Sequence, residues 1–253
     1  TSGSYDRAVP GEGLQLTIDR DLQWHAEQVL AAQVDQAKAR GGNAVVIDVD
    51  TGEVVAMASA PITDPNDPTS ASGGGNPAVE IAYEPGSVLK ALSVSAVIEE
   101  GMAGPATVFS VPDSIKRADL TVHDYYDHSV EDMTLSGILA KSSNVGTILA
   151  AERVSAGTFG GYLKAFGLGS KPNLGLPAET AGQLPDEWSD LDRDFAAFGQ
   201  GISVNTVQLA SAYATIANGG LRMPPRLIDA VIDADGDVEQ LPAAEPEQVI
   251  SEE

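Results

Sequence analysis

Cysteine is absent from the 253 residues, which excludes disulfide bonds, thiolate metal sites and a cysteine nucleophile. Basic residues are few: 14 Lys and Arg stand against 37 Asp and Glu, giving a formal net charge of -23. A chain of that charge repels phosphate backbones and anionic lipid surfaces, so we expect no nucleic-acid partner. The three histidines, His25, His123 and His128, have spacings typical of no zinc motif. The sequence therefore predicts no metal site.

Long apolar runs are also lacking. No stretch of the sequence could span a membrane, and none has the pattern of a signal peptide. Hydrophobic residues nevertheless make up 43% of the chain, which is typical of a globular protein with a buried core. Residues 1–13 are polar and contain Gly and Pro, and we interpret them as a linker. Residues 14–253 are predicted to form one folded domain.

Periodicity in the first part of the chain predicts a strand, a helix and a hairpin. Residues 14–18 alternate as a strand does, and Asp19 is a suitable cap for a helix over 20–39 that ends at Gly41-Gly42. Two β-branched runs, 43–49 and 53–59, flank Asp50-Thr51-Gly52, which is typical of a hairpin. We expect this hairpin to be central to a sheet.

The rest of the chain is richer in helical patterns. Residues 105–132 and 172–194 are predicted to be irregular, and a strand is predicted over 226–232. Helices are expected at 88–98, 133–141, 145–154, 159–166 and 206–217. The order predicts an α+β fold: an antiparallel sheet packed with helices, plus a mainly helical subdomain over about 133–220. We expect the hairpin to pack against the helix over 88–98.

The first chemical signal lies where Pro85-Gly86 breaks the chain before that helix. Ser87 follows the break, and Lys90 comes three residues later, so the two share one helical face. A Ser at a helix N-terminus lies near unpaired N–H groups, and a Lys among apolar neighbours loses its proton more readily. Such a pair can act as a nucleophile with its general base. Because Ser and Lys are also common in ordinary first turns, the pair alone does not establish catalysis.

A second polar signal, Ser142-Ser143-Asn144, follows the helix predicted over 133–141. Ser and Asn also cluster in ordinary loops, so this signal is weak by itself. Upstream, His123 and His128 lie near Asp124 and Asp127. Polar loop clusters of this kind are usually solvated, and we expect this one to have no functional role.

Taken together, these signals resemble a known family. Ser87-x-x-Lys90 and Ser142-x-Asn144 are similar to the first two motifs of penicillin-binding transpeptidases and serine β-lactamases. Further segments match class B penicillin-binding proteins in their order along the chain, and the septal, cell-division type is the most similar. They are Leu16-Thr17-Ile18-Asp19, Asp50-Thr51-Gly52-Glu53, Tyr83-Glu84-Pro85-Gly86-Ser87, Lys141-Ser142-Ser143-Asn144-Val145-Gly146-Thr147, Phe166-Gly167-Leu168-Gly169 and Phe198-Gly199-Gln200-Gly201.

The resemblance implies a peptidoglycan D,D-transpeptidase that works without a cofactor. Ser87 would attack the penultimate D-Ala carbonyl of a stem peptide, and Lys90 would accept the Ser87 proton. Ser142 would pass a proton to the leaving amine, Asn144 would bind the substrate amide, and the Ser87 N–H would form half of an oxyanion hole. β-Lactam antibiotics would acylate the same serine.

The resemblance also implies a cellular location and a set of partners. The protein would act at the extracytoplasmic face of the bacterial cell membrane, anchored by an N-terminal transmembrane helix not present in this chain. Its partners would be peptidoglycan stem peptides, β-lactams and membrane proteins of division or elongation.

One family motif, Lys-Ser/Thr-Gly on a strand, is absent from the sequence. We expect the domain over 14–253 to be incomplete, because the family places that strand after residues similar to Val249-Ile250-Ser251-Glu252, and the chain alone to be inactive. Two alternatives remain open. A β-lactamase or β-lactam sensor shares the Ser/Lys pair, but no deacylating Glu-x-x-Leu-Asn segment follows Ser142. A non-catalytic scaffold of the division machinery would fit a natural loss of the third motif.

Overall fold

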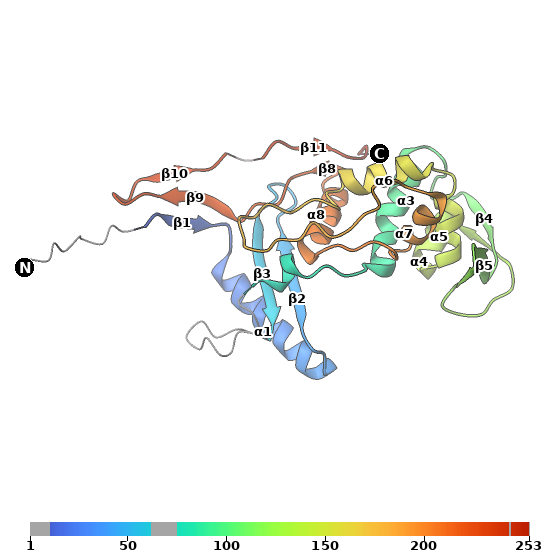
Figure 1. Cartoon of the computed structure of the whole chain (residues 1–253), viewed down its shortest axis with the longest axis horizontal. Helices are drawn as coiled ribbons and strands as arrows, with labels where there is room; N and C mark the ends of the chain where they lie inside the picture. The colour runs from blue at the N-terminus through green and yellow to red at the C-terminus, as the bar shows by residue number, and fades with distance from the viewer. Residues whose placement is uncertain (1–10, 62–74, 243, 253) are drawn as a thin grey trace, which may run out of the picture.

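The computed structural model describes residues 11–61, 75–242 and 244–252, and it begins with a short strand and a long helix (Figure 1). Strand β1 spans Gly13–Leu16, and helix α1 spans Arg20–Ala37. Asp19 caps α1 as predicted, accepting hydrogen bonds from the Asp21 and Leu22 amides. The helix ends earlier than expected, because Lys38 takes a left-handed conformation with φ of 52° and starts the turn before the two glycines.

The predicted hairpin is confirmed. Strands β2 (Gly42–Ile47) and β3 (Val54–Ala60) pair antiparallel, and every second residue of β3 is buried. Helix α1 packs along β3, and helix α8 (Thr206–Ala217) contacts β2. Helix α2 (Pro77–Glu80), which Asn76 caps, contacts both strands. Residues 62–74, which precede α2, lie outside the described residues.

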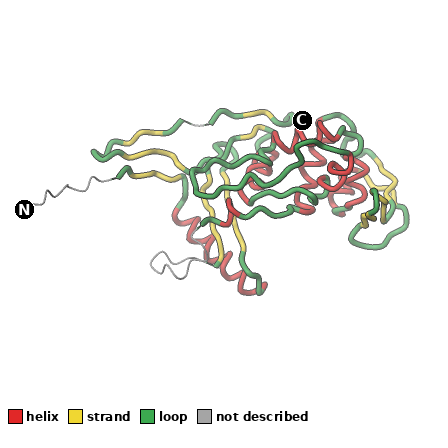
Figure 2. The backbone as a smooth tube through the Cα atoms, in the orientation of Figure 1, coloured by secondary structure: helices red, strands yellow, loops and turns green. Residues whose placement is uncertain are grey.

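The hairpin is not central to a sheet among the described residues, contrary to expectation. Its strands pair with each other, and Glu53 forms a single parallel bridge to Arg226. The three-stranded sheet is elsewhere, with β9 (Ile228–Ile232) between β1 and β10 (Val238–Gln240). Two-residue strands β8 (Leu221–Arg222) and β11 (Glu247–Gln248) form a further pair. Figure 2 shows the extended strands at one end and most helices towards the other.

The helical part follows from α3 onward. A 3-10 turn, η1 (Gly86–Leu89), runs directly into α3 (Lys90–Glu99). Between α3 and α8, the described residues form four further helices. They are α4 (Leu135–Lys141), α5 (Asn144–Ala151), α6 (Ala156–Ala165) and α7 (Asp190–Ala196). Among the described residues, no helix combines the length and apolar character that crossing a bilayer requires.

Residues 105–132, predicted to be irregular, contain short strands. Strand β4 (Val108–Val111) pairs with β7 (Glu131–Thr134), and β5 (Ser114–Arg117) pairs with β6 (Leu120–His123). Each strand has four residues, too few for a clear alternating pattern in the sequence. Helix α7 was also missed; its Ser189 and Asp192 form a capping box within a segment that otherwise looks like a loop.

Two larger groups of buried apolar side chains support these elements, beside a small third group of Val122, Ile148 and Phe198. One lies among the helices and includes Leu89, Leu92, Ile138 and Phe159. The other lies beside the hairpin and includes Val54. Helix α8 belongs to both, since its Val207 packs on the hairpin side and its Ala212 on the helical side. The expected direct packing of the hairpin against the Ser87 helix is therefore wrong, because α8 lies between them (Figure 1).

The predicted linker over 1–13 falls mostly on residues 1–10, outside the described part of the chain. The first regular element, β1, begins at Gly13. The assignment of 14–253 to a single incomplete domain stays a prediction.

Candidate active site

Ser87 lies on the exposed side of η1, one turn before α3 begins. Leu89, two residues on, is fully buried and anchors the turn in the helical core. The Ser87 carbonyl accepts the Lys90 amide, so the two residues belong to one continuous turn. In the part of the chain that the structure describes, no side chain or backbone group forms a hydrogen bond with the Ser87 hydroxyl, which leaves it accessible.

The turn around Ser87 is held by the segment that follows α7. The Gly86 amide donates to the Gly199 carbonyl at 3.0 Å, and the Glu84 carboxylate accepts from the Gly201 amide at 2.9 Å. Gly199 has φ of 80°, and a Cβ there would lie 2.1 Å from the Gly86 oxygen. Only glycine allows this close approach of two backbones. The Phe198-Gly199-Gln200-Gly201 segment thus acts as a template for the serine turn.

Lys90 is 1% exposed, and its amine is directed at the Ser142–Asn144 turn. The Lys90 Nζ donates to the Ser142 carbonyl at 2.5 Å, the Ser142 Oγ at 3.1 Å and the Asn144 Oδ1 at 2.7 Å. Burial lowers the pKa of Lys90 from 10.5 to about 8, although the nearby charge of Asp124 acts in the opposite direction. A lysine with this pKa can exchange a proton near neutral pH.

The Ser142–Asn144 turn connects two helices. Ser142, with φ of 54°, closes α4 in the left-handed conformation, and Ser143 caps α5 by accepting from the Gly146 amide at 2.8 Å. Ser142 is exposed, while Ser143 is 2% exposed. The two helix ends bring one hydroxyl to the surface beside Lys90 and turn the next into the protein.

The structure therefore brings together three of the four predicted residues by direct hydrogen bonds: Lys90, Ser142 and Asn144. The fourth, Ser87, lies one helical turn before Lys90. The pairs are 52 and 54 residues apart in the sequence, so the fold and not local chain geometry creates the cluster.

The polar cluster at 123–128 is only partly the solvated loop that we expected, since His123 and Asp127 are exposed but two other side chains are not. The side chains of Asp124 and His128 are 1% and 3% exposed, and they lie against the second motif. Asp124 accepts hydrogen bonds from Ser143 Oγ at 2.6 Å and the Val145 amide at 3.0 Å. The His123 carbonyl accepts from Asn144 Nδ2 at 3.0 Å. No local pattern in the sequence points to this contact, because Asp124 and Ser143 are 19 residues apart.

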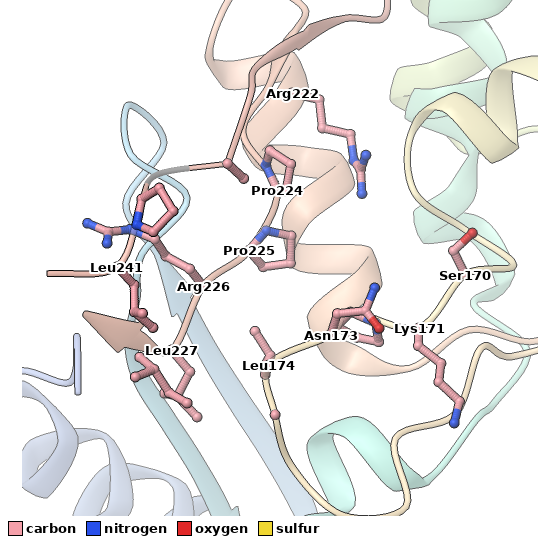
Figure 3. A pocket seen from close by; sticks show the side chains of 15 residues that line it. Ser170, Lys171, Asn173, Leu174, Arg222, Pro224, Pro225, Arg226, Leu227 and Leu241 are labelled. Carbon is pink, nitrogen blue, oxygen red and sulfur yellow. The ribbon is translucent and has the colours of Figure 1, made fainter. Parts of the chain in front are cut away.

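A cavity of about 520 Å³ lies elsewhere and contains none of the predicted site residues (Figure 3). Prolines 224 and 225, Leu174 and the cations Lys171, Arg222 and Arg226 line it. The two arginines already have acidic partners: Arg226 pairs with Glu53 and Asp229, and Arg222 with Glu247. Within the described ranges, no group of three or more His, Cys, Asp or Glu could hold a metal ion.

Comparisons with known proteins agree on one family. Residues 42–253 match the family model described as the penicillin binding protein transpeptidase domain. The chain is 42% identical to penicillin-binding protein PbpB of Mycolicibacterium smegmatis, over 99% of this chain and 40% of that protein. It is 36% identical to peptidoglycan D,D-transpeptidase FtsI of Escherichia coli, over 83% of this chain and 36% of that protein. The chain thus spans about 40% of the length of these relatives.

Solved structures show the same fold. The crystal structure of penicillin binding protein 3 from Mycobacterium tuberculosis superposes with a TM-score of 0.91 and 39% identity, covering 99% of this chain and 57% of that one. The same protein has been solved in complex with aztreonam and with ampicillin. The family model matches residues 42–253, and the relatives and solved structures agree with it. This chain therefore belongs to the penicillin-binding protein transpeptidase family and is similar to its class B members.

Proposed function

We propose that the chain forms part of a peptidoglycan D,D-transpeptidase that acts through a Ser87 acyl-enzyme. The observation that carries the proposal is the environment of Lys90. This amine is buried, has a pKa lowered to about 8, and lies one helical turn from an exposed serine hydroxyl. A nucleophile followed by an amine that can lose its proton near neutral pH is an arrangement suited to acyl transfer. Relatives named peptidoglycan D,D-transpeptidases support the substrate class.

The proposed first step is proton transfer. Lys90 directs its N–H groups at three oxygens of the second motif, and an ammonium has three N–H donors. In that protonated state it has no lone pair for the serine. Loss of one proton frees a lone pair that can accept the Ser87 proton as the oxygen attacks the D-Ala carbonyl. At pH 7, a pKa of about 8 leaves about a tenth of the molecules in this neutral form.

The second motif then serves the leaving group. Ser142 Oγ is within hydrogen-bond distance of Lys90 Nζ, so a proton taken from Ser87 can pass through Ser142 to the departing D-Ala amine. Asn144 is half-buried beside the Lys90 amine, and its proposed role is to hold the substrate amide. A second stem peptide completes the reaction when its amine attacks the acyl-enzyme.

The proposed function also includes reaction with β-lactams and a location outside the cytoplasmic membrane. β-Lactams would acylate Ser87, in line with the aztreonam and ampicillin complexes of the M. tuberculosis relative. Peptidoglycan lies outside the cytoplasmic membrane, so the site would act at that face, with division proteins as partners. The similarity to FtsI and PbpB supports a septal rather than an elongation role.

The test is covalent labelling of the complete gene product with a fluorescent penicillin. We expect stable labelling that Ser87→Ala abolishes and that Ser136→Ala, which changes an exposed serine on α4, leaves intact. Mass spectrometry should place the adduct on the Ser87 peptide. Rapid loss of the adduct by hydrolysis would instead indicate a β-lactamase. An absence of labelling in the complete protein would indicate a non-catalytic scaffold.

A further inference from the structure

Asp124 is the centre of a buried polar cluster that the catalytic steps above do not use. It directly follows β6, and its amide donates to the Asp113 carbonyl at 2.9 Å. Its Oδ2 accepts from Ser143 Oγ at 2.6 Å and lies 3.2 Å from His128 Nε2. Its Oδ1 accepts from the Val145 amide at 3.0 Å. Both oxygens of the Asp124 carboxylate, which is nearly inaccessible to solvent, therefore have hydrogen-bond partners.

These contacts fix the residues on each side of Asn144. Ser143 and Val145 are both bound to Asp124, so the turn between α4 and α5 is attached to the end of β6. The Asn144 Nδ2 donates to the His123 carbonyl, which leaves its Oδ1 to accept from Lys90. The orientation of the Asn144 amide, and through it the contact to Lys90, thus depends on the 123–124 segment.

His128 completes the cluster. Its Nδ1 lies 2.7 Å from the Ser129 carbonyl, and its Nε2 faces Asp124, so both ring nitrogens face acceptors. Only the protonated imidazole donates from both nitrogens. Burial by itself lowers the pKa of His128, but the Ser129 carbonyl, the Asp124 carboxylate and Glu131 raise it overall.

Other charged or titratable groups also surround this cluster. The ring of Tyr126 lies 5.0 Å from that of His128. Lys141 lies over Tyr126 and pairs with Glu131 at 2.5 Å. A pH dependence of this region therefore has to be assigned with matched variants.

We propose that Asp124, oriented by His128, is a positioning residue of the transpeptidase site, holding the second-motif turn so that Asn144 and Ser142 meet the Lys90 amine. This inference rests on the proposed function of the site. Asp124 also acts on Lys90 through its charge, because a buried negative charge favours the protonated ammonium. If Asp124 acts by positioning, its loss should lower the acylation rate. If it acts by its charge, its loss should shift the pH dependence of that rate. One set of variants separates the two effects.

The experiment measures the second-order rate of Ser87 acylation by a fluorescent penicillin from pH 5.5 to 9.5, in the complete gene product. Asp124→Asn keeps the size of the side chain and removes its charge. We expect the rate at high pH to fall on the order of tenfold or more, since small misplacements of catalytic groups can cost up to about 10²-fold. In a plot of acylation rate against pH, the rising limb is the range in which the rate increases with pH. This limb should also move to lower pH, because Lys90 then loses its proton more easily.

Two matched variants assign these effects. Ser143→Ala removes one contact to Asp124 and the cap of α5 but no charge, so the rate should fall while the limb stays in place. His128→Gln removes a positive partner of Asp124, so the limb should move to higher pH, opposite to Asp124→Asn. All variants are first compared with the wild type by circular dichroism and thermal unfolding.

The inference is overturned if wild-type Ser87 is labelled and folded Asp124→Asn has an unchanged rate and profile. It is also overturned if all three variants lower the rate alike with no movement of the limb, because that is the result of a merely structural role. If Asp124→Asn does not fold, the other two variants still decide the question, because Ser143→Ala should lower the rate without moving the limb and His128→Gln should move the limb to higher pH. Failure of the proposed function is recognised separately, since the wild type itself would then not be labelled at Ser87.

Discussion

The turns that carry the two chemical motifs are held in different ways. The Ser87 turn is held through contacts to its own backbone: Gly86 lies against Gly199, and the Val88 carbonyl accepts from the Tyr213 hydroxyl at 2.7 Å. The Ser142–Asn144 turn is fixed by side chains, through Lys90 on one side and Asp124 on the other. The nucleophile's position thus depends on space that only glycine leaves free. The position of its proton-transfer partners depends on charge.

This difference has a functional reason. A nucleophile must be accessible and free of competing hydrogen bonds, so its support has to reach the backbone of its turn and leave the Ser87 hydroxyl untouched. The groups that move protons have to hold several donors and acceptors at hydrogen-bond distance, which side chains do best. Substitutions that add a Cβ should therefore affect the first turn, and substitutions or pH changes that alter charge should affect the second.

Removing the amine that links the two turns should have the largest effect. Lys90→Met keeps the buried stem and deletes the base, and we expect the acylation rate to fall on the order of 10²–10⁴-fold. The measurement is the second-order rate of fluorescent penicillin labelling in the complete gene product. Lys164→Met, on the exposed side of α6, is the control and should label at the wild-type rate. A Lys90→Met variant with the wild-type rate would contradict the role of general base.

Adding one methyl group at Gly199, which lies against the Ser87 turn, should have the next largest effect on the acylation rate. Gly199→Ala places a Cβ 2.1 Å from the Gly86 oxygen at a φ of 80°, so the turn has to move. We expect labelling to slow on the order of 10²-fold, as displacements of about 1 Å do, together with a lower melting temperature.

The control for this substitution is Gly157→Ala. Gly157 lies in α6, and a Cβ there meets nothing within 4 Å. The variant should keep the wild-type labelling rate and be slightly more stable, because Ala is favoured over Gly in helices. Equal behaviour of the two glycine variants would show that the close approach at Gly199 is unimportant.

The pH should change the rate without any substitution. The general base must be neutral, and the pKa of Lys90 is lowered to about 8, so acylation should rise about tenfold per pH unit below pH 8 and level off above it. A flat rate between pH 6 and 8 would remove Lys90 from the proton-transfer step.

The smallest effect should come from the start of the helix that leads to the second turn. Thr134 caps α4 by accepting from the Gly137 amide at 3.0 Å. Thr134→Ala should lower the free energy of unfolding by about 1 kcal/mol, measured by chemical denaturation. Thr134→Ser keeps the hydroxyl and should recover most of the loss. Acylation should change little in either variant, because the turn itself is held by Lys90 and Asp124.

Much of the fold was predictable where the signals are local. Helix α8 was predicted with its observed bounds from its apolar periodicity, and the capping box of Asn205 and Gln208 accounts for its start. Asp19 identified the start of α1 for the same reason. The four-residue strands β4 to β7 were missed, since each has too few residues to display a period. The hairpin was recognised, but not its neighbour, because α8 reaches it from about 150 residues further along the chain.

The sequence by itself determined the motif order, the helix caps and the identity of the groups that the site uses, because each of these is written within a few neighbouring residues. Only the tertiary structure decided how those groups act. Burial in the helical core lowers the pKa of Lys90, and the packing of β6 against α5 turns Asp124, which looked like a solvated loop residue, into a buried partner of Ser143. Desolvation and contacts between distant residues arise only when the chain is packed, so no local pattern encodes them.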